Sequence, residues 1–175
     1  LDWDYIPAKV IEMSTHKQHN YLTINKGARD GVSVDMGVIG ADGVVGIVSA
    51  VGEKYALVVP MIHPKISISS RLKSNSQLGG TSWDGRDYRY VNMIEISRHV
   101  DVEAGDTVVT SGLTDVFPEG IMVGVITETE LGKGDNYHHT TVELSTDYKA
   151  LKYVQVLSNK NAKTTDEIGK NDGLE

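Results

Sequence analysis

The stretch GDTVVTSGLTDVFPEGIMVG, residues 105–124, decides what kind of protein this sequence describes. Ser111 lies in it between Thr110 and Gly112. A serine beside a glycine can be the nucleophile of a hydrolase, or it can help to turn the chain between two strands. The first interpretation makes the chain an enzyme, and the second makes the stretch a corner of an all-β fold.

The hydrolase interpretation has the right residue types in the wrong local sequence. A catalytic serine needs a histidine base and a carboxylate that orients it. His63, then Asp84 or Asp87, then Ser111 follow the chain order of two-barrel serine proteases. Those proteases, however, place GDSGG around the serine, whereas this chain has GDTVV. The GxSxG elbow fails too, because Val109 stands where its first glycine belongs. A two-barrel serine hydrolase with Ser111 therefore remains only an alternative.

A corner between two strands explains the same residues more simply. Ser and Gly bend the chain after VVT, and Pro118 followed by Gly120 reverses it before IMVG. Phe117 is expected to tuck beneath this turn. The residues expected to shape the corner and the strand after it are Gly105, Asp106, Thr110, Ser111, Gly112, Phe117, Pro118, Gly120 and Gly124.

The whole chain has the periodicity of strands. About twelve short β-branched runs alternate with turn residues, at the spacing typical of sandwiches or small barrels. In KISISSRL, Ile66 and Ile68 mark a buried side while Lys65 and Ser67 face outward. The predicted strands are IPAKVIEMS, NYLTINK, GVIG, VVGIVSAV, YALVVPMI, KISISSRL, QLGGTSW, YRYVNMIEI, DTVVTSG, IMVGVITETE, HHTTVELS and KYVQVLS. Only TDYKALKY suggests a helical turn, with Asp147 as its cap.

A weak internal repeat links two parts of the sequence. MGVIGADGVVGIVSAV can be aligned with AGDTVVTSG and PEGIMVGVITE. Glycine inside a strand weakens it unless a bulge, a bend or a close backbone approach requires it. Its recurrence therefore predicts two similar barrels that bend their sheets at matching places. The alignment pairs Gly37 with Gly105, Gly43 with Gly120, and Gly46 with Gly124.

Composition limits the classes of function. The net charge of −7 and the scattered Lys and Arg argue against nucleic acid as a partner. No run approaches the roughly 18 apolar residues of a membrane-spanning helix. Because the sequence begins at Leu1 rather than Met, we expect a fragment whose membrane anchor lies upstream. The polar residues 159–175 are expected to form a disordered tail.

Metal and cofactor sites are not expected. Cysteine is absent, and the neighbours His138 and His139 point to opposite faces of a strand, so they cannot easily share one ion. His16 and His19 lie in a polar connection without further ligands. The glycines of GADGVVG lack the lysine and the helix that a phosphate loop requires, and ADG is better explained as a hairpin turn.

The aromatic residues around the DG turn of WDGRDYRY are candidates for a binding surface. Trp83, Tyr88 and Tyr90 could be contact residues at an interface. Equally, the two tyrosines could share one strand face and cover a core edge. A further alternative is a glycan-binding module in which these rings stack on sugars.

The body of the chain resembles the extracytoplasmic domain of the MreC family of rod-shape-determining proteins. DVEAGDTVVTSGLTDVFPEGIMVGVI, residues 101–126, is similar to the family signature GD-x-VVTSGL-x-x-x-FP-x-GI-x-VG. INKGARDGVSVDMGVIGADGVVGIVSAV, residues 24–51, is similar to a second family motif that includes Gly31. The resemblance extends over residues 5–157. One departure is the order DMG, where the family has GM before its strand, so that Met36 and Gly37 look exchanged.

The resemblance implies a fold, a function and a set of partners. The fold is two small six-stranded β-barrels, and the function is a non-enzymatic scaffold for cell elongation, without cofactors. The location implied is the periplasmic side of the bacterial inner membrane, with a single-pass anchor upstream. The implied partners are a second copy of the chain, a class B penicillin-binding transpeptidase, and MreD, RodA and MreB through the complex.

The sequence also predicts how the strands divide between the two barrels. We expect residues 20–83 to form a central, inserted barrel. Residues 1–19 together with 84–158 are expected to form the second barrel, because the first strand would pair with the C-terminal group.

Overall fold

The computed structural model describes residues 2–160, and their strands confirm the predicted all-β class. Within this range no helix is long and apolar enough to cross a membrane. The elements are β1 (Trp3–Met13), β2 (Leu22–Ile24), η1 (Ala28–Asp30), β3 (Gly37–Gly40), β4 (Gly43–Val51), β5 (Ala56–Pro60), β6 (Ser69–Leu72), β7 (Leu78–Ser82), β8 (Tyr90–Ile94), β9 (Thr107–Thr110), β10 (Met122–Glu130), β11 (His139–Leu144), η2 (Tyr148–Ala150) and β12 (Tyr153–Asn159), where η marks a 3-10 helix.

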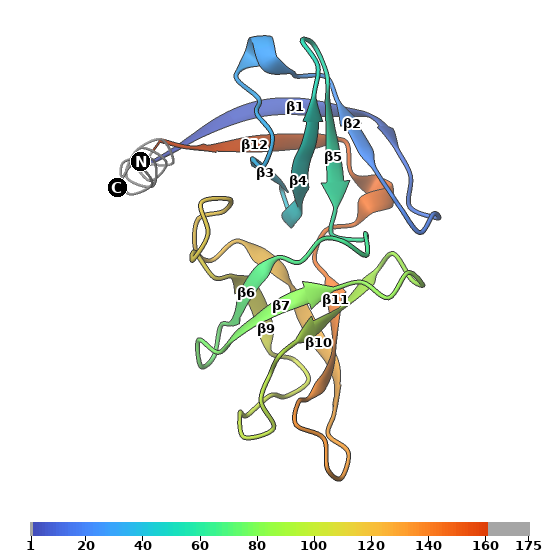
Figure 1. The fold of residues 1–175 in the computed structure, drawn as a ribbon, viewed down its shortest axis with the longest axis vertical. Helices are drawn as coiled ribbons and strands as arrows, with labels where there is room; N and C mark the ends of the chain where they lie inside the picture. Colours follow the sequence, from blue (N-terminus) through green and yellow to red (C-terminus); the bar gives the residue numbers. More distant parts are fainter. Residues whose placement is uncertain (1, 161–175) are drawn as a thin grey trace, which may run out of the picture.

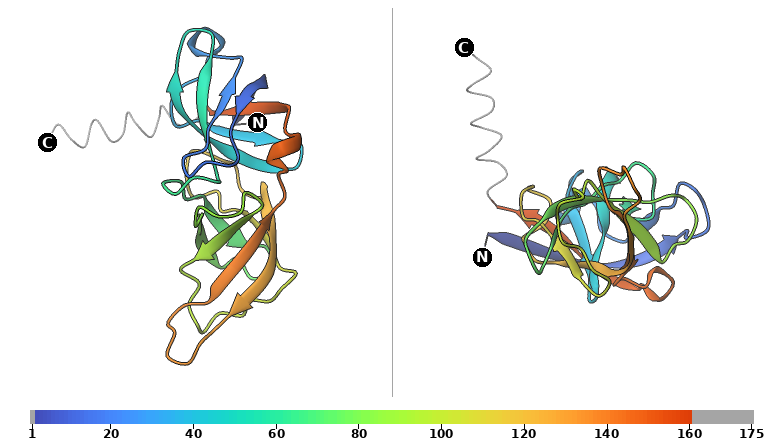
Figure 2. Two further views of the ribbon diagram at one scale, coloured as in Figure 1. Left: turned by 90° about the vertical axis from the view of Figure 1, so that its right-hand side faces the viewer. Right: turned by 90° about the horizontal axis from the view of Figure 1, so that it is seen from below.

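The strands close into two six-stranded antiparallel barrels, as expected. The strand order around the first barrel is β1-β12-β3-β4-β5-β2. Around the second barrel it is β10-β11-β8-β7-β6-β9. The barrels lie end to end along the long axis of the molecule (Figures 1 and 2).

The predicted boundaries of the barrels are wrong. The inserted barrel consists of the consecutive strands β6 to β11, rather than residues 20–83, and it separates β5 from β12. The reason is the double role of β1, which pairs with β12 from Trp3 to Lys9 and with β2 from Val10 to Met13. These two pairings close the first barrel around β1–β5 and β12.

The predicted tail also begins too early. Asn159 is the last residue of β12, opposite Trp3, and the Lys160 N–H donates to the Asp2 carbonyl oxygen at 2.8 Å. Residues 161–175 lie outside the described residues, so the remainder of that prediction stays a prediction.

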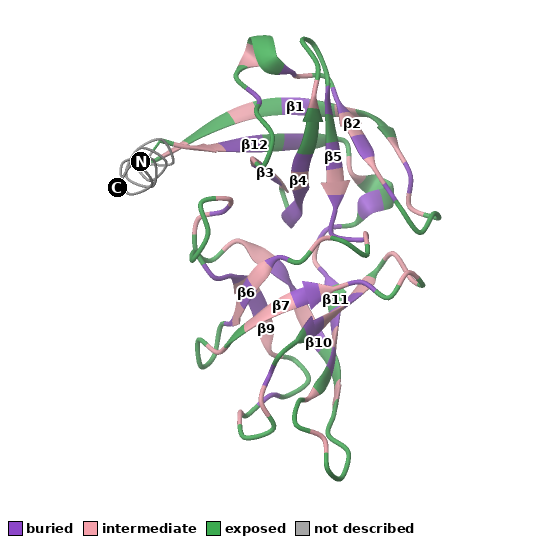
Figure 3. Ribbon diagram, viewed as in Figure 1, coloured by how far each residue is buried: buried purple, intermediate pink, exposed green. Residues whose placement is uncertain are grey.

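The strands form because apolar residues alternate with polar ones. In β12, Val154 and Val156 are buried in the barrel, while Tyr153 and Gln155 are exposed. Ile68 in the connection before β6 is buried and its neighbour Ser67 is exposed, as predicted. The buried residues of both barrels form one cluster, and Figure 3 shows them as purple bands along the strands of both barrels.

The two barrels repeat one architecture. Starting from β1, the order β1-β12-β3-β4-β5-β2 corresponds strand for strand to β7-β6-β9-β10-β11-β8. The bulges correspond as well. Between β3 and β4 the register skips Val45, and between β9 and β10 it skips Val123 at the matching place. Because β12 takes the position of β6, the first barrel is a circular permutation of the second.

The register refines the sequence alignment of the repeat. Gly46 and Gly124 do match, and each lies against the neighbouring strand, where a Cβ would overlap the carbonyl oxygen of Val59 or Glu143. The other two pairings are offset, because Val38 corresponds to Val108. Gly105 therefore matches Asp35 rather than Gly37, and Ile121 rather than Gly120 matches Gly43.

Asp35 takes a conformation that favours glycine. Its φ is +72° and that of Gly105 is +97°, both in the left-handed region. Their hydrogen bonds are also equivalent, since the Asp35 N–H donates to the Val48 carbonyl oxygen and the Gly105 N–H to that of Ile126. The DMG order is thus no exchange of Met36 and Gly37, because Asp35 itself occupies the left-handed position.

Candidate functional site

Ser111 has the environment of a turn residue. It is only 3% exposed, and its Oγ lies 2.7 Å from the Ser69 Oγ and accepts the Leu113 N–H at 3.2 Å. Its carbonyl oxygen accepts the Arg71 Nε–H at 3.2 Å. All these contacts tie the start of the β9–β10 loop to β6 and to itself.

The other members of the considered triad make different contacts. The Nδ1 of His63 accepts the Lys65 N–H at 3.1 Å, and its ring packs edge-on against His19 at 5.1 Å between centroids. Asp84 accepts the Arg86 N–H at 3.0 Å. Among residues 2–160, no hydrogen bond links Ser111 to a histidine. The chain order therefore does not bring a catalytic triad together.

Thr110 holds the two ends of the β9–β10 loop, residues 111–120. Its Oγ1 donates to the Pro118 carbonyl oxygen at 2.6 Å and accepts the Ile121 N–H at 2.8 Å. The Thr110 N–H in turn donates to the Ile121 carbonyl oxygen at 2.8 Å. Gly112 and Gly120 have φ of +75° and +91°, which lets the loop reverse at both ends.

This loop replaces a tight turn of the other barrel. In the first barrel, Gly40 pairs with Gly43 across the turn formed by Ala41 and Asp42, at the place that corresponds to Thr110 and Ile121. In the second barrel the longer loop rises toward β3 and β12 (Figure 1). The repeat thus carries its largest difference at the stretch that identifies the sequence.

The loop docks the second barrel onto the first. The Phe117 ring and the Val116 carbonyl oxygen lie where a side chain at Gly37 would project, so β3 needs glycine there. Phe117 is only 4% exposed, and the Asn159 Nδ2–H of β12 donates to Asp115 at 3.4 Å. Burial of a phenylalanine side chain stabilises by about 1.5–3 kcal/mol. Phe117 therefore packs between the two barrels as well as beneath its own turn.

A second clamp is formed by the connection from β11 to β12. The hydroxyl of the fully buried Tyr148 donates to the Val45 carbonyl oxygen and accepts the Met61 N–H at 3.1 Å. Burial raises the pKa of Tyr148, so its hydroxyl stays protonated and can donate. The Thr146 Oγ1 donates to the Val44 carbonyl oxygen at 2.8 Å. Through Thr146 and Tyr148, these hydrogen bonds hold the connection against β4 and against Met61, which follows β5.

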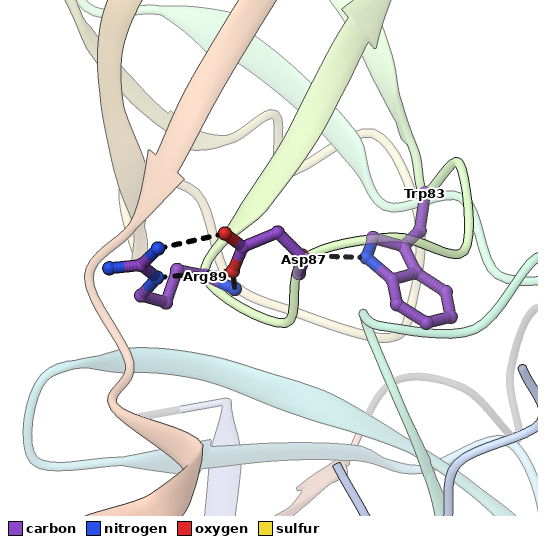
Figure 4. Close-up of polar contacts among 3 residues, drawn as sticks. All are labelled: Trp83, Asp87 and Arg89. Atoms are coloured by element: carbon purple, nitrogen blue, oxygen red, sulfur yellow. Dashed lines mark hydrogen bonds and ion pairs between the residues drawn. The ribbon is translucent and has the colours of Figure 1, made fainter. Parts of the chain in front are cut away.

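Trp83 is placed inside the protein, unlike a residue that meets a partner. It is 4% exposed, and its Nε1–H donates to the Asp87 carbonyl oxygen at 2.9 Å (Figure 4). Arg89 binds the Asp87 carboxylate through Nη2 at 2.8 Å and Nε at 3.1 Å. These hydrogen bonds from Arg89 lower the pKa of Asp87 to about 2. The predicted role of Trp83 at an interface, or in stacking on a sugar, does not fit this position.

Tyr88 and Tyr90 are half-buried. The Lys149 Nζ lies 4.5 Å from the centroid of the Tyr88 ring, and the Arg89 guanidinium lies 5.5 Å from that of Tyr90. Tyr88 also packs against the buried cluster. Their contribution to a binding surface stays a prediction.

Four of the six histidines have defined side-chain contacts, and these contacts lie in separate places. His138 Nε2 lies 2.9 Å from the Val100 carbonyl oxygen, whereas His139 Nε2 lies 3.3 Å from the Asp135 carboxylate. His19 meets His63 in the first barrel. In the described range 2–160, no group of three or more potential metal ligands converges.

Two exposed tyrosines and two further apolar residues of the first barrel share one outer face, a grouping that the sequence analysis missed. We call this the outer apolar face and define it by Tyr5, Pro7, Ile39 and Tyr153. Tyr5 is 51% exposed and Tyr153 is 65% exposed. The register places all four side chains on the outside of β1, β12 and β3. A hollow of about 320 Å³ is lined by three of them, Pro7, Ile39 and Tyr153. The alternation in KYVQVLS was the available signal, since it separates Tyr153 from the buried valines.

Comparison with known proteins agrees with this architecture. The family described as "Rod shape-determining protein MreC, barrel core" matches residues 10–158. The cell shape-determining protein MreC of Listeria monocytogenes is 29% identical over 171 residues, which is 95% of this chain and 58% of that protein. The chain thus spans less than two thirds of this relative's length.

Solved structures have the same fold. A structure of MreC from Listeria monocytogenes superposes with a TM-score of 0.82 at 28% identity, over 91% of this chain and 77% of that one. A complex between penicillin-binding protein 2 and MreC from Helicobacter pylori contains a chain that superposes with a TM-score of 0.70 at 19% identity, over 91% of this chain and 99% of that one. The family match, the two barrels and the loop signature agree, and the chain belongs to the MreC family of cell shape-determining proteins.

Proposed function

We propose that this chain is a non-enzymatic scaffold that binds a class B penicillin-binding transpeptidase during cell elongation. The observation that carries the proposal is the shared two-barrel fold, which includes the MreC chain seen with penicillin-binding protein 2. Binding would regulate peptidoglycan synthesis by favouring one conformation of the transpeptidase, since a partner shifts an equilibrium only through differential affinity. Cell shape follows from where and when that synthesis occurs.

A scaffold also fits the chemistry of the described residues. Ser111 is buried in a turn, and Trp83 is fixed inside its loop. The tyrosines of the outer apolar face are exposed, as residues that bind another protein must be. The stretch that resembled a nucleophile turn serves to hold two barrels together, which gives the scaffold a defined shape.

The location and the wider complex follow from the same proposal. The chain would lie on the periplasmic side of the inner membrane, in a protein anchored by a single upstream helix. It would associate with a second copy of itself and, through the complex, with MreD, RodA and MreB. No cofactor or nucleic acid is required for such a role.

Surface plasmon resonance tests the proposal directly. The chain is passed over the immobilised extracytoplasmic region of the class B transpeptidase from the same genome, at modest salt. Saturable binding is expected. Absence of binding by a natively folded chain would refute the partner. Labelling by a fluorophosphonate probe, which reacts with activated serines, would refute the non-enzymatic role.

A further inference from the structure

On the outer apolar face, the first residue of β12 extends beyond the end of β3, the strand that pairs with it on that side. β3 pairs with β12 at three positions, ending with Ile39 opposite Gln155. The next pair would join Tyr153 to Ala41, but the chain has already entered its turn there. Among residues 2–160, β12 therefore has no main-chain partner on that side at Tyr153, which lies past the end of β3.

The unpaired side of β12 presents main-chain hydrogen-bonding groups. The Val10 N–H donates to the Lys152 carbonyl oxygen, and the Lys160 N–H donates to that of Asp2, so the even-numbered residues of β12 face β1. The odd-numbered residues face β3, because directions alternate along a strand. The N–H and C=O of Tyr153 consequently point to the side of β12 where β3 would lie if its pairing continued.

The side chains around this position form a site of suitable shape. Pro7, Ile39, Ala41 and Tyr153 line the hollow of about 320 Å³, which is room for one or two apolar side chains. A second hollow of about 230 Å³ continues from it past Gly40 to the connection that carries Tyr148. Exposed apolar surface of this kind, beside free main-chain groups, is typical of sites that add a strand from a partner.

We propose that the two hollows form a groove in which the transpeptidase docks. An extended apolar segment of the transpeptidase lies beside Tyr153, where β3 would lie if its pairing with β12 continued. The inference rests on the proposed function and adds the surface and the kind of segment. The segment pairs with the Tyr153 N–H and C=O and packs on the tyrosine ring. It places an aliphatic or aromatic side chain in the hollow over Gln155, which the register sets between Pro7 and Ile39. An extended segment fits better than a helix, because a helix already satisfies its own main-chain groups.

Two matched tyrosine variants test the surface. Tyr153→Ala removes a ring that is 65% exposed, so the barrel should keep its stability, which a thermal melt checks. Tyr137→Ala removes a ring that is 53% exposed on the β10–β11 loop of the other barrel. In the surface plasmon resonance assay, Tyr153→Ala is expected to raise the Kd for the transpeptidase about tenfold or more. Tyr137→Ala is expected to change that Kd by less than about twofold.

Photo-cross-linking supplies an independent readout. With p-benzoylphenylalanine in place of the exposed Gln155, ultraviolet light should join the chain to the transpeptidase. The same group in place of Leu131, which is 40% exposed on the β10–β11 loop, should give no product.

The outcomes separate the two proposals. If wild type binds and Tyr153→Ala binds equally well, the groove is not the docking site, although the scaffold function stands. If the natively folded wild type does not bind, both are wrong. If Gln155 cross-links only to a second copy of the chain, the groove is a self-association surface and the inference is overturned.

Discussion

Replacement of Tyr148 by phenylalanine most sharply tests the clamp that holds the β11–β12 connection on the first barrel. The substitution keeps the buried ring and removes only the hydroxyl, which joins the Val45 carbonyl oxygen and the Met61 N–H. These two partners remain bonded to each other, since the Met61 N–H also donates to the Val45 carbonyl oxygen at 3.2 Å. Neither group is left without a partner, so no full desolvation cost arises.

The expected loss follows from this geometry. Two hydrogen bonds are removed, each with a net contribution of about 0.5–1.5 kcal/mol, and the retained bond between the partners offsets part of the loss. We expect the free energy of unfolding to fall by about 1–2 kcal/mol. Tyr148→Ala should cost about 3–5 kcal/mol, because it also leaves a cavity of ring size.

Urea denaturation followed by circular dichroism and by the fluorescence of Trp3 and Trp83 measures the effect. Tyr137→Phe is the matched control, because its ring is exposed, and it should change the free energy by less than about 0.5 kcal/mol. An unchanged free energy for Tyr148→Phe would refute the clamp. A loss as large as that for alanine would show that the retained bond between Val45 and Met61 does not compensate.

Four further substitutions test separate parts of the account. Gly124→Val should prevent native folding, because a side chain there overlaps a carbonyl oxygen of β11, and a native near-ultraviolet spectrum would contradict this. Asp35→Gly should raise the free energy of unfolding by up to about 1 kcal/mol, as judged by urea denaturation, since φ is +72°. Ser111→Ala should lower it by about 1–2 kcal/mol through the lost bond to β6 and leave transpeptidase affinity unchanged. Burial, together with the neighbouring His19 and Lys65, lowers the pKa of His63. The free energy of unfolding should therefore be highest above the ordinary histidine pKa, where the ring is neutral in both states. It should fall as the pH drops through the lowered pKa. His63→Gln should flatten that part of a stability profile measured against pH.

The strands could be predicted because their information is local. Each β-branched run between turn residues became a strand, and Asp147 caps η2 by accepting the Lys149 N–H. The repeat was also visible, because Gly46 and Gly124 meet the same steric demand in both barrels. Alternation and close backbone approach leave their marks on neighbouring residues.

The division into barrels could not be predicted, because it depends on which apolar strand closes which sheet. β6 and β12 occupy equivalent positions, and nothing in their own residues assigns one to each barrel. The contacts of Phe117 with Gly37 and of Tyr148 with β4 join residues far apart in the sequence. The outer apolar face likewise exists only once β1, β12 and β3 lie side by side.

Hydrogen–deuterium exchange of the chain, alone and saturated with the transpeptidase, tests the central claim most directly. A two-barrel scaffold that docks its partner beside Tyr153 predicts slower exchange in peptides covering residues 3–9, 38–42 and 152–157. Peptides of the β10–β11 loop, residues 131–138, should exchange equally fast in both states. Protection confined to that loop, or no change anywhere at saturating partner, would contradict the account.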